Sequence, residues 1–163
     1  MSLRYIPAEM VRISDILRGD FEPLELDHMR FFRLPWCSTI RLRVMGVAVS
    51  SYISQDRNFA RISLFDGTGT IDVRAFDEGV SLLLDKESGD VYSKGTILDV
   101  IGRPRSWREE IYLQPVTVVK VEDPNLIILR SLELLLLDLR RIPMLIGQRR
   151  NLREEGLEQN KTY

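Results

Sequence analysis

The stretch STIRLRVMGVAVSSYI, residues 38–53, decides the fold. Its apolar side chains alternate with other residues, first at Ile40, Leu42 and Val44 and then, one step out of phase, at Val47 and Val49. Alternation with a period of two predicts a β-strand that buries one face. The phase changes at Gly46, and a glycine at such a change is typical of a strand that bulges or bends sharply. A bent first strand of this kind can contribute to both halves of a small closed barrel.

Four further segments are predicted to be strands: NFARISLF (58–65) and TIDVRAFD (70–77), which alternate in the same way, and TILDVIGRP (96–104) and EIYLQPVTVVKV (110–121). The turn DGTG at 66–69 predicts a tight hairpin, and EGVSLLLDKESG at 78–89 predicts a short helix. The order is then three strands, a short helix and two strands. This is the layout of the OB-fold, a partly open Greek-key barrel of five strands. We therefore predict a mainly β protein with an OB-fold domain at residues 37–123.

The segment before the barrel, residues 1–36, is expected to form an N-terminal extension that packs on it. Within VRISDILRGDF, the pattern predicts a short strand near Val11 and then a one-turn helix that is capped by Ser14 and ended by Gly19. Trp36 precedes the first barrel strand and is interpreted as a core residue.

The segment after the barrel predicts a helix at residues 124–149, with Pro143 ending or kinking it. Polar residues 150–163 are expected to form a disordered tail. The helix carries apolar residues with 4-3-4-3 spacing, a seam similar to that of a coiled coil, and other leucines lie off this seam. Such a helix needs more than one neighbour. Part of it can pack on its own barrel, and the seam predicts oligomerisation. The seam residues are Ile128, Leu132, Leu135, Leu139 and Ile142.

Composition limits the possible functions. The formal net charge is −1, so a site for a polyanion has to be a local patch. A single cysteine, Cys37, and a single histidine, His28, exclude an internal disulfide and the usual zinc-ligand sets. The sequence has no phosphate-binding glycine loop or nucleophile elbow, and Asp66, Asp72 and Asp77 are interpreted as turn and surface carboxylates. We therefore expect a soluble intracellular protein that is not an enzyme and has no cofactor or bound metal.

The binding face of an OB-fold lies around its second and third strands, between the loops that join strands 1–2 and 4–5. Three rings are predicted there: Phe76 from strand 3, Trp107 from the 4–5 loop and Tyr52 from the 1–2 loop. Six arginines accompany them: Arg57, Arg61, Arg74, Arg103, Arg105 and Arg108. Rings that stack on unpaired bases contribute about 1–3 kcal/mol each, and arginines bind phosphates, so this face predicts a site for single-stranded nucleic acid. Alternatively, Phe76 covers the barrel rim, and Trp107 packs on its own hairpin or on a partner protein.

Several of these segments resemble one family. IDVRAFD (71–77) resembles the third-strand signature DVR-x-W of the middle subunit of replication protein A, and GRPRSW (102–107) resembles that subunit's G-x-x-RS-aromatic loop. VVKVEDPNLIILRSLELL (118–135) is similar to its passage from the last strand into the trimerisation helix. IPAEMVRISDILRGDF (6–21) is similar to the start of archaeal members.

The resemblance implies a single-stranded-DNA-binding subunit of a heterotrimer that acts in DNA replication, repair and recombination. In the family the two aromatic positions stack on bases, and they fall on Phe76, where Trp is usual, and on Trp107, where Phe is usual. The helix would pair with a large and a small subunit. The location implied is the nucleoid of an archaeal cell or the nucleus of a eukaryotic one. A structural adaptor with little DNA contact, including the related telomere-capping subunit, and an RNA-binding module remain alternatives.

Overall fold

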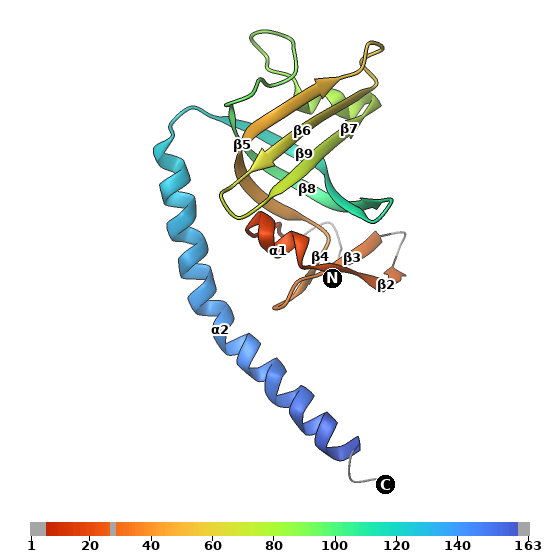
Figure 1. Ribbon diagram of the computed structural model, residues 1–163, viewed down its shortest axis with the longest axis vertical. Coiled ribbons are helices and arrows are strands. Elements are labelled where there is room, and N and C mark those ends of the chain that lie inside the picture. The colour runs from red at the N-terminus through yellow and green to blue at the C-terminus, as the bar shows by residue number, and fades with distance from the viewer. Residues whose placement is uncertain (1–5, 27–28, 160–163) are drawn as a thin grey trace.

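The structure is a computed structural model that describes residues 6–26 and 29–159, with side chains described for residues 6–23 and 30–147. A barrel lies beside a small second sheet, and a long helix passes both (Figure 1). The elements are, in chain order, β1 (Glu9–Met10), α1 (Ile13–Leu17), β2 (Asp20–Leu26), β3 (Met29–Arg33), β4 (Ser38–Thr39), β5 (Leu42–Ile53), β6 (Phe59–Phe65), β7 (Thr70–Phe76), the 3₁₀ helix η2 (Asp77–Leu83), β8 (Ile97–Trp107), β9 (Glu110–Val121) and α2 (Asn125–Gln159).

The five long strands form the barrel. The sheet order is β1-β5-β6-β7-β9-β8, and pairing of β5 with β8 closes it. β7 pairs with β9 in parallel, whereas β5–β6, β6–β7, β5–β8 and β8–β9 are antiparallel. The short helix η2 lies between the third and fourth barrel strands, as the sequence predicted. The prediction of an OB-fold is confirmed.

The first barrel strand, β5, bends as predicted, but its alternation of inward and outward residues continues further than predicted. It pairs with β8 through Val47 and with β6 from Val47 onward, so its two halves serve two sides of the barrel. The inward-facing residues continue past Gly46 to the buried Ala48, and the register shift follows between Ala48 and Ser50. The predicted inward placement of Val47 and Val49 is therefore wrong. Gly46 is needed for another reason: a Cβ there would lie 2.8 Å from the carbonyl oxygen of Phe65.

The N-terminal extension contains more structure than the sequence indicated. β2, β3 and β4 form a separate three-stranded sheet, and β1 adds to the barrel beside β5. Val11, Ile13 and Ile16 are buried in the same core as the barrel side chains, so the extension packs on the barrel. The predicted cap is wrong. Ser14 lies inside α1, Arg12 is the N-cap residue, and its backbone N–H donates to the Asp15 carboxylate at 3.0 Å.

The long helix α2 continues beyond its predicted end at residue 149, because it runs to Gln159 and passes through Pro143. Arg, Glu, Gln and Leu fill most positions from 148 to 159, and these residues favour helix. The predicted disordered tail is therefore wrong for residues 150–159, and residues 160–163 lie outside the described part. No helix in that described part is long and apolar enough to cross a membrane.

Candidate nucleic-acid interface

One side of the barrel presents arginine and aromatic side chains on the outer surface of β6, β7 and β9 and at the ends of β5 and β8. Strand alternation explains the placement, because Ile71, Val73 and Ala75 of β7 are buried and their neighbours Arg74 and Phe76 face outward. The same parity applies to β6, where Arg61 lies opposite Arg74. We call this surface the strip. It consists of Tyr52, Phe59, Arg61, Arg74, Phe76, Arg103, Arg105, Trp107 and Tyr112.

At one end of the strip three rings lie in a row. The ring centroids of Tyr52 and Phe59 are 6.1 Å apart, and those of Phe59 and Phe76 are 5.3 Å apart. Tyr52 is 51% exposed and Phe76 is 45% exposed, so both present ring surface to solvent. Phe59 was missed by sequence reasoning, although it lies one residue before the buried Ala60 and its outward parity could have identified it.

At the other end of the strip Trp107 lies on the β8–β9 hairpin and is 61% exposed. The two turn residues, Arg108 and Glu109, both have positive φ, at 48° and 68°. A turn of this kind normally favours Asn and Gly, so the hairpin carries backbone strain, which often accompanies functional sites. The guanidinium of Arg108 lies 5.7 Å from the centroid of the Trp107 ring. Neither Trp107 nor Phe76 is buried in the barrel.

The two predicted stacking rings do not share one groove. Asp72 of β7 lies beside Tyr112 of β9, which places the Trp107 end of the hairpin near Thr70, at the start of β7. Phe76 lies at the opposite end of the same strand. Six residues of strand span about 20 Å. The rings therefore mark the two ends of the strip, and the arginines lie between them.

The predicted arginines differ in what already binds them. Among the described residues, Arg61 and Arg103 form no ion pair, and their Nε atoms are buried without a hydrogen-bond partner. Arg105 Nε donates to Gln114 Oε1 at 3.0 Å, and Arg57 Nη2 donates to the Gly89 carbonyl at 2.7 Å. Arg57 belongs to the β5–β6 loop, whereas Arg108 belongs to the hairpin beside Trp107. Arg61, Arg103 and Arg108 therefore have no ion pair or hydrogen bond from their side chains among the described residues, whereas Arg57, Arg74 and Arg105 do.

Arg74 is the most strongly engaged of the six. Its Nη2 lies 2.9 Å from Asp72 Oδ2 and 2.8 Å from Glu110 Oε2, and its guanidinium lies 5.0 Å from the Tyr112 ring centroid. Burial lowers the pKa of Arg74, but the hydrogen bonds that Arg74 donates to Glu110 and Asp72, with the two negative charges, outweigh burial, so the pKa lies above its ordinary value. Tyr112 was not identified from the sequence, although outward parity on β9 could have found it.

The other residues considered from the sequence have structural surroundings. Asp66 closes the β6–β7 turn by accepting from Thr68, and no group of acidic, Cys or His side chains in the described part is arranged to hold a metal ion. Trp36 packs partly buried against the core, as predicted, and its Nε1 donates to Glu9 at 3.0 Å. Cys37 is partly buried and free, and burial raises its pKa to about 11. His28 lies outside the described residues.

A second exposed surface runs along α2. Every residue of the predicted seam is exposed: Ile128, Leu132, Leu135, Leu139 and Ile142. The opposite side of the helix contacts the barrel and the extension, and this contact is mainly ionic. Leu134 is its buried apolar residue, whereas Arg130 and Arg141 are only 7% and 6% exposed. Part of the helix thus packs on its own chain, and the seam does not.

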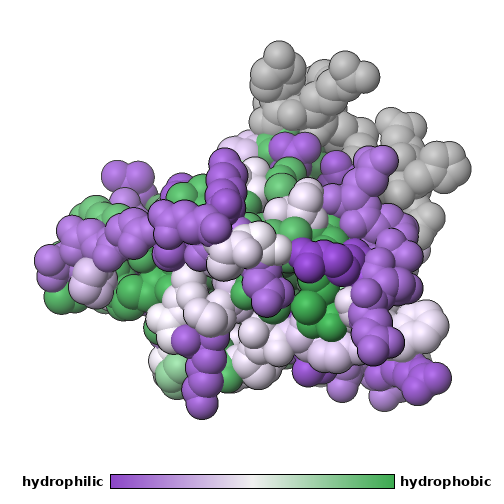
Figure 2. All heavy atoms as spheres, turned by 90° about the horizontal axis from the view of Figure 1, so that it is seen from above, coloured by the Kyte–Doolittle hydropathy of each residue, from purple (hydrophilic) through white to green (hydrophobic). Residues whose placement is uncertain are grey.

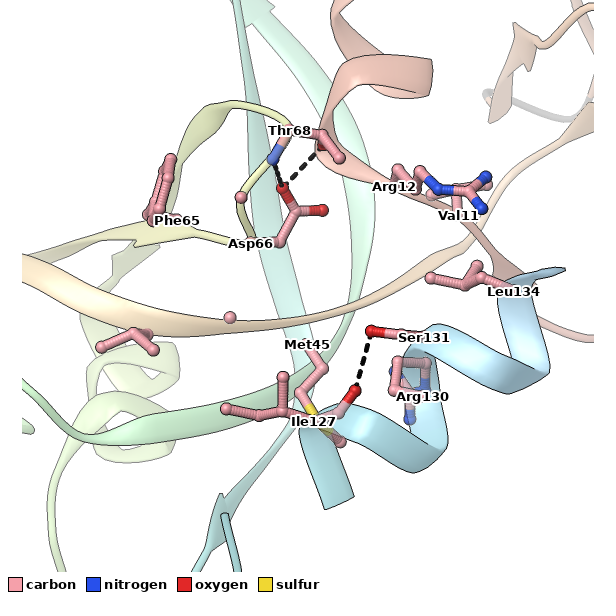
Figure 3. Close-up of a pocket in the computed structure, with 13 residues that line it drawn as sticks. Val11, Arg12, Met45, Phe65, Asp66, Thr68, Ile127, Arg130, Ser131 and Leu134 are labelled. Carbon is pink, nitrogen blue, oxygen red and sulfur yellow. Dashed lines mark hydrogen bonds between the residues drawn. The ribbon is translucent and has the colours of Figure 1, made fainter. Parts of the chain in front are cut away.

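Ion pairs fix the inner side of α2. Arg130 Nη2 lies 2.8 Å from Asp99 Oδ2, and Arg43 binds the same carboxylate at 2.6 Å. Arg12 pairs with Asp138 at 2.7 Å. Burial raises the pKa of Asp99, but hydrogen bonds from Arg43 and Arg130 lower it to below its ordinary value. Near these pairs, a cavity of about 240 Å³ separates α2 from the β5 bend and the β6–β7 turn (Figure 3).

Comparison with known proteins identifies the fold. No protein-family model matches the chain, and no curated protein matches it by sequence. A chain from a replication protein A heterotrimer bound to single-stranded DNA matches with a TM-score of 0.64 and 21% identity, over 83% of this chain and 98% of that one. A chain from the S. pombe Stn1–Ten1 complex matches with a TM-score of 0.61 and 17% identity, over 96% and 98% of the two chains. A chain from yeast replication protein A bound to single-stranded DNA matches with a TM-score of 0.58 and 18% identity, over 79% of this chain and 87% of that one. The protein therefore has the OB-fold that is also found in replication protein A and in the Stn1–Ten1 complex, and the likeness extends over most of its length.

Proposed function

We propose that this protein binds single-stranded DNA on the strip and acts as one subunit of an assembly similar to the replication protein A heterotrimer. The observation that carries the proposal is the strip itself, where exposed rings at both ends flank Arg61 and Arg103, which form no ion pair among the described residues. Unpaired bases can stack on the rings while Arg61 and Arg103 meet phosphates, and this mode of binding needs no particular base sequence. The protein would act wherever the nucleoid or nucleus exposes single strands.

Charge predicts how strong this binding is. The net charge of −1 gives no long-range attraction to DNA, and Arg74 is already paired with carboxylates. On the face seen in Figure 2, apolar residues lie in separate patches between charged ones. One OB-fold covers only about 4–16 nucleotides. We therefore expect weak binding by the isolated chain, strengthened when several subunits bind one strand, and a steep loss of affinity with salt.

The seam of α2 is the proposed assembly surface. Its five residues are apolar and exposed, and a soluble protein rarely leaves such a row in water. The 4-3-4-3 spacing fits the packing of another helix along it. We expect a large and a small subunit to supply helices, in keeping with the heterotrimer to which the fold is similar.

The stacking rings give the decisive experiment. Phe76→Ala and Trp107→Ala together should weaken binding of fluorescein-labelled oligo-dT by at least about tenfold, since each stacked ring contributes about 1–3 kcal/mol. Fluorescence anisotropy at low salt measures this. Phe65→Ala is the matched control, because Phe65 is also a phenylalanine, is 44% exposed, and lines the cavity beside α2 instead of the strip.

The same assay separates the alternatives. Unchanged affinity in the double variant would contradict stacking on these rings. A wild-type protein that binds no oligo-dT, alone or assembled, would favour the structural adaptor. Competition by unlabelled oligo-rU that equals competition by oligo-dT of the same length would favour an RNA-binding role, because the 2′-hydroxyl distinguishes the two strands.

A further inference from the structure

The middle of the strip holds an arginine that a ligand cannot use without a rearrangement. Arg74 lies between the ring row and Trp107, where a strand that touches both ends has to cross. Its Nη2 is within 2.9 Å of one carboxylate and 2.8 Å of another. One positive and two negative charges give the group a net charge of −1. A phosphate that approaches the middle of the strip therefore meets repulsion.

The two carboxylates that bind Arg74 are held very differently. Asp72 is 20% exposed, and it also accepts a hydrogen bond from Ser63 Oγ at 2.6 Å. Glu110 is 70% exposed and stands at the start of β9, next to the strained hairpin turn. Within the described residues, Arg74 is its ion-pair partner and no other cation binds it. Glu110 can therefore leave Arg74 while Asp72 stays.

Arg74 itself would stay in place when Glu110 leaves. The Tyr112 ring lies 5.0 Å from its guanidinium carbon, and Asp72 accepts from both its Nε and its Nη2. Asp72, Arg74 and Glu110 line one pocket, so the Nη2 donor that Glu110 vacates can meet a ligand there. Carboxylate and phosphate oxygens both suit the donor geometry of a guanidinium, so either group can fill this position.

We propose that Glu110 is an internal competitor for the phosphate position on Arg74, and that single-stranded DNA displaces it on binding. This inference rests on the proposed function and assigns Glu110 the role of limiting affinity at that site. Each binding event exchanges one ion pair for another, so Arg74 orients the strand without a large gain in affinity. Removing the Glu110 charge frees Arg74 and removes a repulsion in one step.

The test uses the full chain and anisotropy of labelled oligo-dT at low salt. Glu110→Gln should bind about two- to fivefold more tightly than wild type, the range that corresponds to an exposed ion pair of about 0.4–1 kcal/mol. Glu109→Gln is the matched control, since it changes the net charge equally at the adjacent position and Glu109 forms no ion pair among the described residues. It should change affinity much less.

A double-mutant cycle isolates the interaction between the two residues. In an Arg74→Gln background, Glu110→Gln should bring no more gain than Glu109→Gln does, because the competition needs both partners. Equal gains from both glutamine variants in the wild-type background would overturn the inference and leave a general charge effect. If wild type binds oligo-dT and loses affinity in the Phe76→Ala, Trp107→Ala variant, while Glu110→Gln leaves affinity unchanged, only this inference fails. If neither wild type nor Glu110→Gln binds, both proposals fail.

Discussion

The strip and the seam of α2 both expose large apolar side chains, yet they are built for different contacts. On the strip, aromatic rings at the two ends flank the arginines, and Arg74 is the arginine there that forms ion pairs among the described residues. On the seam, Ile and Leu follow one another at helical spacing, while Arg130 and Arg141 are buried on the other side of the helix. Charge between the apolar groups suits a polyanion with flat bases, whereas an uncharged row suits another helix. Exposure alone does not distinguish a ligand site from an assembly surface, but the neighbouring charges do.

The largest effect should come from breaking the seam. Leu132→Asp with Leu139→Asp places two charges on the exposed row, so association with other subunits should be lost while the barrel stays folded. Size-exclusion chromatography with light scattering measures the association, and circular dichroism measures the fold. Arg140→Asp is the matched control, because it makes the same change of −2 in net charge at an exposed position off the seam. An unchanged assembly in the double variant would show that the seam is not the assembly surface.

Breaking the inner side of α2 should cost stability instead of association. Asp99→Asn leaves the buried Arg130 and its neighbour Arg43 without their shared carboxylate, and the free energy of unfolding should fall by about 2–3 kcal/mol. Urea denaturation measures this decrease. Asp85→Asn, at a more exposed pair with Lys120, should cost much less. Equal decreases in the two variants would contradict the assignment of α2 attachment to Asp99.

Acid should reduce the difference in stability between wild type and Asp99→Asn. The pKa of Asp99 is lowered in the folded protein, so its charge stabilises the fold above the unfolded value of about 3.9. That stabilisation is lost as the pH falls below this value and through the folded pKa. The difference in unfolding free energy between wild type and Asp99→Asn should therefore shrink as the pH falls from 7 to 3. A difference that stays constant over this range would contradict a charged Asp99.

On the strip, removing the two free arginines should have a moderate effect. Arg61→Gln with Arg103→Gln should weaken oligo-dT binding by about tenfold. The dependence of log K on log salt should also fall by up to about 1.4, because each phosphate that is no longer neutralised accounts for about 0.7. Arg57→Gln with Arg105→Gln makes the same change in charge at arginines that already donate to protein acceptors. If the two double variants lose the same affinity and the same salt dependence, the existing hydrogen bonds of Arg57 and Arg105 do not limit their contribution to binding.

The smallest effect should come from the hairpin that carries Trp107. Glu109→Gly relieves a positive φ of 68° and should raise the free energy of unfolding by about 0.5–1 kcal/mol. Urea midpoints at an unchanged m-value measure the gain. Glu87→Gly is the control at an exposed position that is not among the residues with positive φ, and it should bring no gain. No difference between the two variants would show that the turn is not strained.

Much of the architecture behind the strip and the seam could be predicted from local sequence. The strand order, the outward parity of Phe76 and the spacing of the α2 seam depend on residues close together in the chain. The prediction was wrong at Val47 and Val49, where the register shift falls two residues beyond Gly46, and for residues 150–159, where favourable helix formers outweigh polarity. The sheet β2-β3-β4 was missed because its strands lack the clear alternation of the barrel strands.

The sequence by itself determined that five alternating strands would close into a barrel and that a leucine-rich helix would follow, because hydrophobic periodicity is a local property of the chain. Only the tertiary structure decided which arginines are free. Arg61 and Arg74 have the same parity and lie opposite each other, yet Glu110, 36 residues from Arg74 along the chain, neutralises only one of them. The distance between Phe76 and Trp107 was also decided by the tertiary structure, because the parallel pairing of β7 with β9 sets which strand ends lie together.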